Sequence, residues 1–280
     1  MNRSVMRYLI RNPAGLAGIC MLAVILFITY CLPLMIDYQP AAQRPELALR
    51  APDRHFLCGT DYLGRDLLSR LIEASRITLG VSLRAACLAL AIGCLVGGVA
   101  GLTPPFWERQ IVRLIDLFIG FPKLFVILLV VGLTRPSLGL IIVIMGSFSW
   151  METARIVRAE VAVRRHMPFI QALVALGQSS GRIYFRHLLP NIAGPVLTSL
   201  ALLIGSLILV ESGLSFIGLG VQPPLASWGT ILNQARLDPT GAWWLALFPG
   251  VLILLTVIGF NLIGDSLQHH LQRQDSSTDD

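Results

Sequence analysis

Six blocks of apolar residues dominate this 280-residue sequence. A membrane hydrocarbon core of about 30 Å needs roughly 20 apolar residues per helix, and the blocks approach or exceed that length. Hydrophobic residues make up 55% of the chain and charged residues only 14%, which is rare in a soluble domain of this size. The sequence therefore predicts an all-α membrane protein with six transmembrane helices. The predicted spans are residues 16–36, 80–102, 114–133, 137–151, 192–210 and 242–263.

Three of these spans need a specific argument. The third contains Lys123, and only the sequence TRPS separates it from the fourth. Pro136 and the combined length argue against one continuous helix, so a tight turn between two spans is predicted. The first block follows several arginines, as in a cleaved signal peptide, but its apolar run exceeds the usual ~7–15 residues, so an uncleaved span is predicted.

The distribution of arginine predicts that both termini are cytoplasmic. With this orientation the short outer loops carry only Arg135 and Arg236. The long outer segment, residues 37–79, also holds arginines, but they alternate with acidic residues and weigh little against the assignment. The arginines on the cytoplasmic side are Arg3, Arg7, Arg11, Arg109, Arg113, Arg155, Arg158, Arg164, Arg165, Arg182, Arg186 and Arg273.

This topology divides the chain into segments. Apolar residues between Leu67 and Leu79 recur at helical spacing opposite Arg65, Asp66 and Glu73, which predicts an amphipathic helix lying in the outer interface. The final QDSSTDD is typical of a disordered tail. The predicted segments are a cytoplasmic N-terminus (1–15), the first span (16–36), an extracytoplasmic segment with the amphipathic helix (37–79), a five-helix core (80–265) with a cytoplasmic loop at about 152–191, and a cytoplasmic tail (266–280).

Several classes of function are disfavoured. The chain has no G-x-x-x-x-G-K-[ST] phosphate loop, so no nucleotide cofactor is predicted for it. The five cysteines have no C-x-x-C spacing, and four lie in apolar blocks, so neither a metal site nor a disulfide framework is predicted. No catalytic residue is predicted, because GLSFIG has Ile217 where a G-x-S-x-G motif needs glycine. A membrane-embedded enzyme is the alternative class, and it would need ionisable groups inside the bundle, where the spans offer mainly Lys123.

Three glycines of the second span, Gly93, Gly97 and Gly101, are spaced four residues apart. Small residues at this period line one helix face and allow another helix to approach closely. The pattern predicts a packing face, either within the chain or against a partner subunit.

The segment ESGLSFIGLGVQPPLASWG follows the fifth span and is rich in glycine, proline and aromatic residues. It is too apolar for an ordinary solvated loop and too interrupted for a helix. Irregular backbone at membrane depth is tolerated only where protein buries it or water lines it. We therefore expect the outer mouth of a pathway or a re-entrant helix, with Glu211, Ser215, Phe216 and Trp228 as candidate pathway residues.

The segment QALVALGQSSGRIYFRHLLPN lies on the predicted cytoplasmic side. Phe169, Leu173 and Leu176 form one apolar face of a short helix that ends at Gly177, a typical C′ residue. Ser179 or Ser180 is expected to cap a second helix. Two readings remain open for the first helix, which either lies on the membrane surface or docks into a groove of a soluble subunit.

Together, four segments resemble the permease subunits of ABC importers of the dipeptide, oligopeptide and nickel group, across nearly the whole chain. They are GTDYLGRDLLSR, QALVALGQSSGRIYFRHLLPN, ESGLSFIGLGVQPPLASWG and FNLIGDSLQHHL, in the order that the family has them. The second is similar to the family's cytoplasmic EAA loop. Gln171 stands where that loop has glutamate, and Leu173 replaces its second alanine, which puts in doubt a salt bridge through position 171.

The resemblance implies a permease fold like that of methionine importers in the bacterial inner membrane, and a role in import rather than catalysis. It implies a second, homologous permease, two cytoplasmic ATPases that bind ATP and Mg, and an extracytoplasmic binding protein. Peptides are the expected cargo, with nickel or a metal chelate as the alternative. The implied coupling residues are Phe169, Gln171, Ala172, Leu173, Leu176, Gly177, Arg182, Arg186, Leu189 and Pro190.

Overall fold

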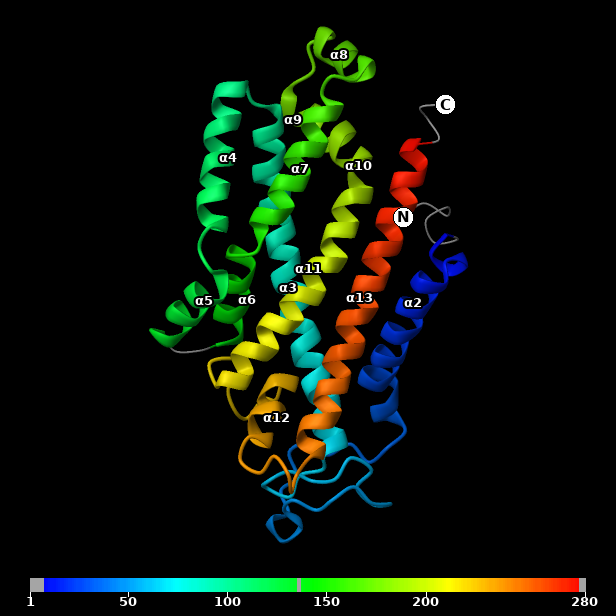
Figure 1. Ribbon diagram of the computed structural model, residues 1–280, viewed down its shortest axis with the longest axis vertical. Helices are drawn as coiled ribbons and strands as arrows, with labels where there is room; N and C mark the ends of the chain where they lie inside the picture. Colours follow the sequence, from blue (N-terminus) through cyan, green and yellow to red (C-terminus); the bar gives the residue numbers. More distant parts are fainter. Residues whose placement is uncertain (1–7, 135–136, 277–280) are drawn as a thin grey trace.

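A computed structural model gives the structure of the protein and describes residues 8–134 and 137–276. These residues form long helices that lie side by side, with short helices and loops at both ends (Figure 1). Five helices are long and apolar enough to cross a membrane, and a bent pair supplies a sixth crossing if it counts as one span. The all-α prediction is thus confirmed. Arg3, Arg7 and Arg135, used above to predict orientation, lie outside the described residues.

The first span begins at α2 (Pro13–Leu26) and continues through a π-helical turn, Phe27–Cys31, and a 3-10 turn, Leu32–Leu34. Asn12 caps its start, because its side-chain oxygen accepts a hydrogen bond from the Ala14 amide at 3.1 Å. The helix packs along α13 (Trp244–Ser276), where Gly18 lies directly against the backbone of Gly259. This contact joins the two ends of the chain.

The second span differs from its prediction. One helix, α3 (Leu67–Leu102), runs for 36 residues, so residues 67–79 are its first turns and not a separate interfacial helix. The amphipathic pattern is real, but its apolar face is buried by protein, since Leu67 and Ile72 are both fully buried. Asp66 caps the helix by accepting a hydrogen bond from the Ser69 amide at 2.9 Å.

The loop before α3 is held by Asp61, whose carboxylate is fully buried. It accepts hydrogen bonds from the Leu63 and Arg65 amides at 2.9 and 3.0 Å, and it pairs with the guanidinium groups of Arg65 and Arg70 at 2.7 and 3.3 Å. The chain turns at Gly64, whose φ of +66° favours glycine. The GTDYLG segment therefore anchors the N-terminal end of α3.

The third span is broken. It consists of α4 (Pro105–Ile119) and α5 (Lys123–Gly132), which meet at an angle of 69°. Pro122 occupies the N-cap position of α5, and a proline has no amide to donate and disfavours helical geometry in the residue before it. The sequence had indicated a span crossing Pro122, and the structure bends there instead.

The fourth span consists of α6 (Leu138–Ser147) and α7 (Trp150–Arg164), which together extend well beyond the predicted residue 151. The fifth is α11 (Ala193–Ile217), followed by a loop and the short helix α12 (Trp228–Ala235). The last is α13, which continues to Ser276, so residues 266–276 of the predicted disordered tail are helical. An uninterrupted run without glycine or proline after Gly264 allows this extension.

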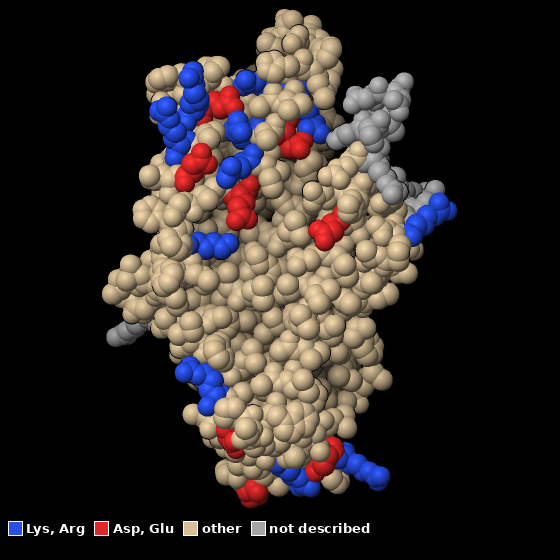
Figure 2. Space-filling view, in the orientation of Figure 1, with Lys and Arg blue, Asp and Glu red and all other residues tan. Residues whose placement is uncertain are grey.

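Charged residues gather at the two ends of the face shown in Figure 2, with a largely uncharged band between them. One charged end lies over the region of α4 and α7, and the other over the segment before α3. This pattern is typical of a protein that spans a bilayer, because charges are costly in hydrocarbon.

Candidate functional site

The best candidate for a contact with a soluble partner is the short helix α8 (Pro168–Ala175), which protrudes at one end of the bundle (Figure 1). It follows α7 closely and is joined to α11 by α9 (Ser180–Ile183), a π-helical turn, Tyr184–Leu188, and α10 (Leu189–Asn191). Pro168 occupies its first turn, where a missing amide hydrogen costs little.

Gly177 ends α8 as the sequence predicts. Its φ is +74°, a conformation that side chains other than glycine adopt with strain. The Gly177 amide donates to the Val174 carbonyl at 2.9 Å, and the Gln178 amide donates to the Leu173 carbonyl at 3.1 Å. These two bonds form a Schellman motif, which fixes the direction in which the chain leaves the helix.

The surface of α8 exposes apolar side chains. Ile170 is buried against the bundle and Leu173 is partly buried beside it, so one face of the helix is anchored. On the outside, Leu176 is 78% exposed and Phe169 is 43% exposed. Val174, on the other side of the anchored face, is also exposed. An apolar outer face on an anchored helix is typical of a surface that docks into a groove.

Gln171 makes a bond that a glutamate at this position would lack. Its side-chain amide donates to the carbonyl of His166 at 3.2 Å, which ties α8 back to the segment after α7. A carboxylate has no hydrogen to donate there. Glutamine in place of glutamate at position 171 thus removes a negative charge and adds a hydrogen bond within the chain. The neighbouring Ala172 is exposed.

The remaining predicted coupling residues lie between α8 and α11. Arg182 and Arg186 are exposed, Leu189 is partly buried, and Pro190 is exposed in α10. Ser179 occupies the N-cap position of α9, but its side chain makes no capping hydrogen bond.

Tyr184 is a connection that the sequence analysis missed. Its hydroxyl donates to the Cys94 carbonyl in α3 at 2.6 Å, and its ring lies where a side chain on Gly98 would have to be. The segment that follows α8 is thereby joined to the longest helix of the bundle. Only the absence of a side chain at Gly98, within the glycine-rich part of α3, hinted at so close an approach.

A second cluster of polar groups lies at the opposite end of α11, around Glu211. This carboxylate is fully buried and accepts hydrogen bonds from the hydroxyls of Ser215 at 2.7 Å and Ser212 at 3.5 Å. The side chains of Ser227 and Thr78 also lie beside it. The cluster therefore joins α11, the start of α12 and α3.

Trp228 closes this cluster. Its side chain is fully buried, its indole Nε1 donates to the Ser75 hydroxyl at 3.0 Å, and its backbone amide donates to the Thr78 hydroxyl at 3.2 Å. Gly229 lies so close to α11 that a Cβ there would be 2.2 Å from the Ser212 carbonyl oxygen. The first turn of α12 is therefore pinned between α3 and α11.

The structure corrects the expectation for this segment. Residues 211–217 are helical and belong to α11, and the irregular part of the segment is confined to the loop between α11 and the short helix α12. Glu211, Ser215 and Trp228 are buried, whereas Phe216 is 38% exposed. In this structure three of the four candidates therefore hold the segment between α11 and α12 in place, and the pathway role of all four stays a prediction.

The three spaced glycines of α3 face α7. A Cβ on Gly93 would lie 2.7 Å from Thr153, one on Gly97 would lie 2.5 Å from the Ala154 carbonyl oxygen, and one on Gly101 would lie 2.7 Å from Val161. Of the two readings left open, the structure shows the one within the chain. The absence of side chains lets the two helices touch along this face.

Replacing Gly97 with leucine is expected to lower the free energy of unfolding by about 1–3 kcal/mol, because the new side chain meets backbone that must move away. Gly80 in the same helix is the matched control, since a Cβ there has no neighbour within 4 Å. The yield of folded protein and its thermal stability in detergent would be compared. Equal stability of the Gly97→Leu and Gly80→Leu proteins would contradict the packing role.

The sequence is similar to a known protein family and to several named permeases. Residues 90–274 match the family described as binding-protein-dependent transport system inner membrane component. A dipeptide transport system permease protein, DppC, of Alkalihalophilus pseudofirmus is 33% identical over 96% of this chain and 88% of its own length. A di/tripeptide transport system permease protein, DppC, of Pseudomonas aeruginosa is 35% identical over 93% of this chain and 88% of its own length.

Two further comparisons extend this picture. A glutathione transport system permease, GsiD, of Pectobacterium atrosepticum is 32% identical over 96% of this chain and 88% of its own. Among solved structures, the inward-facing MetNI methionine ABC transporter matches with a TM-score of 0.55 and 17% identity, covering 72% of this chain and 97% of that one. The shared fold is that of an importer permease.

Proposed function

The chain belongs to the family of binding-protein-dependent transport system inner membrane components, and we propose that it forms one half of the pathway by which an ATP-driven importer carries short peptides into the cell. It is an inner-membrane permease subunit of an ABC importer. Members of this family work with ATPase and binding-protein subunits.

Peptides are the cargo that the relatives support. Those described above are named for dipeptides, tripeptides and glutathione, and they match over nearly the full length of the chain. In residues 8–134 and 137–276, no group of three or more His, Cys, Asp and Glu side chains is placed to hold a metal ion. Bare nickel is therefore disfavoured, because its transfer needs such ligands, and a nickel chelate is disfavoured because the relatives are named for peptides.

The proposed importer contains further subunits besides this chain. A second, homologous permease would complete the pathway, and two cytoplasmic ATPases would bind ATP and Mg. The chain itself would not hydrolyse ATP, because its sequence has no phosphate-binding loop. The end that carries α8 would then be cytoplasmic, as would both termini.

The exposed apolar face of α8 is the observation that carries the coupling role. Leu176 and Phe169 would insert into a groove on an ATPase, and closure of the ATPase pair on ATP would move α8. Its anchoring residues, Ile170 and Leu173, would pass that motion to the bundle. The hydrogen bond from Tyr184 to Cys94 would carry it to α3.

Uptake by the complete importer in proteoliposomes tests the cargo. We expect ATP-dependent accumulation of a labelled dipeptide that needs the binding protein and that unlabelled di- and tripeptides inhibit. A nickel chelate at the same concentration should leave the rate unchanged. Inhibition by the chelate without inhibition by peptides would overturn the peptide assignment while leaving the permease role in place.

A further inference from the structure

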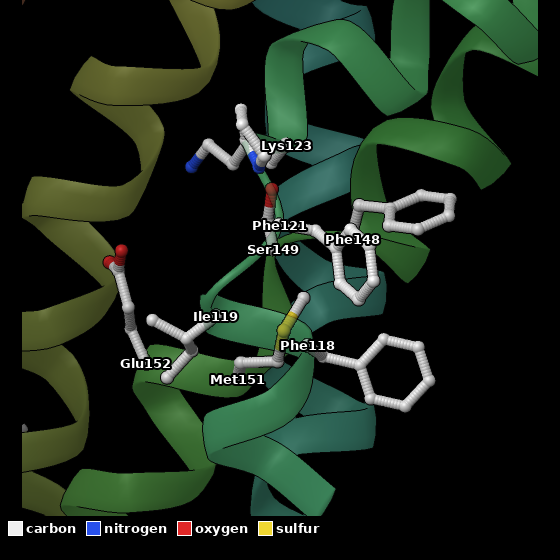
Figure 3. A pocket seen from close by; sticks show the side chains of 9 residues that line it. Phe118, Ile119, Phe121, Lys123, Phe148, Ser149, Met151 and Glu152 are labelled. Atoms are coloured by element: carbon white, nitrogen blue, oxygen red, sulfur yellow. The ribbon is translucent and has the colours of Figure 1, made fainter.

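A cavity of about 250 Å³ opens where the third span is broken, at the junction of α4, α5, α6 and α7 (Figure 3). The N-terminal ends of α5 and α7 both lie at this cavity, because Lys123 begins the one helix and Ser149 precedes the other. A second hollow of about 230 Å³ adjoins it and shares several lining residues, including Lys123 and Phe148. Broken helices whose N-termini face a cavity within the membrane are a common way to build substrate sites in transporters.

The cavity holds one positive and one negative side chain. In Figure 3 the amine of Lys123 and the carboxylate of Glu152 both lie on the side that faces α11, while the rings of Phe118 and Phe148 point to the other side. No hydrogen bond or ion pair of Lys123 or Glu152 is formed within the described parts of the chain. Both residues lie within apolar spans, where an ionisable group is costly unless it has a function.

Ser149 supplies an independent sign of a ligand. Its side chain lines the same cavity and is 4% exposed, yet its hydroxyl has no hydrogen-bond partner. It occupies the N-cap position of α7 without capping the helix. A buried hydroxyl left unpaired costs free energy that a bound polar group would offset.

Two other charged side chains on the elements around the cavity pair with each other. Asp116 in α4 and Arg155 in α7 lie 4.0 Å apart, and both are more than half exposed. The lining of the cavity therefore includes one cation and one anion without a partner in the described parts of the chain, together with an unpaired hydroxyl and several aromatic rings. That arrangement matches a zwitterion with an apolar side chain and not a molecule of one charge.

From this arrangement we infer that the cavity binds the backbone of a short peptide during its passage, an inference that rests on the proposed function. Lys123, with the positive end of α5, binds the C-terminal carboxylate. Glu152 binds the N-terminal ammonium group, and Ser149 hydrogen-bonds to the backbone between them. Phe118, Phe121 and Phe148 contact peptide side chains without selecting one, because aromatic surfaces accept many apolar groups.

Equilibrium dialysis of the purified permease–ATPase complex, without its binding protein, tests this site directly. Three labelled forms of alanyl-phenylalanine would be used, namely the free dipeptide, its N-acetyl form and its C-terminal amide. For the free dipeptide we expect Lys123→Gln and Glu152→Gln each to weaken binding about tenfold, the effect of losing one charged hydrogen bond. Glu152→Gln should change binding of the N-acetyl form by less than about twofold, and Lys123→Gln should do the same for the amide.

The controls separate binding from stability. Lys123→Arg keeps the positive charge and should retain affinity, and the pair Asp116→Asn with Arg155→Gln removes nearby charges without touching the cavity. Residues that only stabilise the helix ends would weaken binding of all three peptides equally, and that result would overturn the site. Absence of binding to the wild-type complex would also overturn it, whereas the proposed function would still stand if that complex imported dipeptide with its binding protein.

Discussion

Replacing Leu176 with aspartate is expected to abolish peptide uptake while the protein remains folded in the membrane. The side chain is 78% exposed, so the substitution removes little packing within the chain. In the complex, a carboxylate would enter an apolar groove of the ATPase and remain without a partner, which is costly. We expect uptake in proteoliposomes to fall at least about tenfold, as is typical for loss of a central apolar anchor.

Val163→Asp is the matched control for this substitution. Val163 lies near the end of α7 and is 68% exposed, so it tests the same chemical change outside α8. It should keep most of the uptake and copurify with the ATPases in normal yield. Wild-type uptake by the Leu176→Asp protein would rule out α8 as the coupling helix.

Replacing Trp228 with alanine is expected to give the largest loss of stability. The indole is fully buried at the meeting point of α3, α11 and α12, and its Nε1 donates to Ser75 at 3.0 Å. Truncating a buried tryptophan costs about 3–5 kcal/mol, and here it would also release the first turn of α12. Thermal unfolding of the detergent-solubilised protein measures the effect.

Two other variants separate the contributions at this position. Trp228→Phe keeps an aromatic ring but loses the hydrogen bond to Ser75 and part of the buried volume, so we expect a loss of about 1–3 kcal/mol, smaller than that of Trp228→Ala. Trp243→Ala removes a tryptophan that is 48% exposed and should change stability less than Trp228→Ala does. A Trp228→Ala protein as stable as the Trp243→Ala protein would show that α12 is not pinned through this side chain.

The position of α8 could be predicted from the sequence because the residues that start, shape and end this helix are close together in the chain. The apolar spacing of Phe169, Leu173 and Leu176 predicts a short helix, and a glycine at the end of such a run favours the left-handed conformation. The structure has Gly177 at a φ of +74° and the two hydrogen bonds of a Schellman motif. All of these depend on residues within a few positions of one another.

The candidate pathway could not be read in the same way. Glu211 looked like an acid at the mouth of a pathway, but its partners include Thr78 and Ser227, which are far from it in sequence. The cavity at Lys123 and Glu152 likewise depends on where α4 and α7 come together. A list of residues cannot show which polar groups are satisfied until the fold has brought their partners close.

The sequence by itself determined the class of the protein, since long apolar blocks have few alternatives to membrane helices and their spacing sets most of the spans. Tertiary structure alone decided three further features: α3 continues through residues 67–79, the third span bends by 69°, and Glu211 is buried. The physical reason is the same in each case. Whether an amphipathic segment joins the next helix, how far a span bends at a proline and whether a carboxylate is buried all depend on the residues that pack against them. Those residues come from distant parts of the chain.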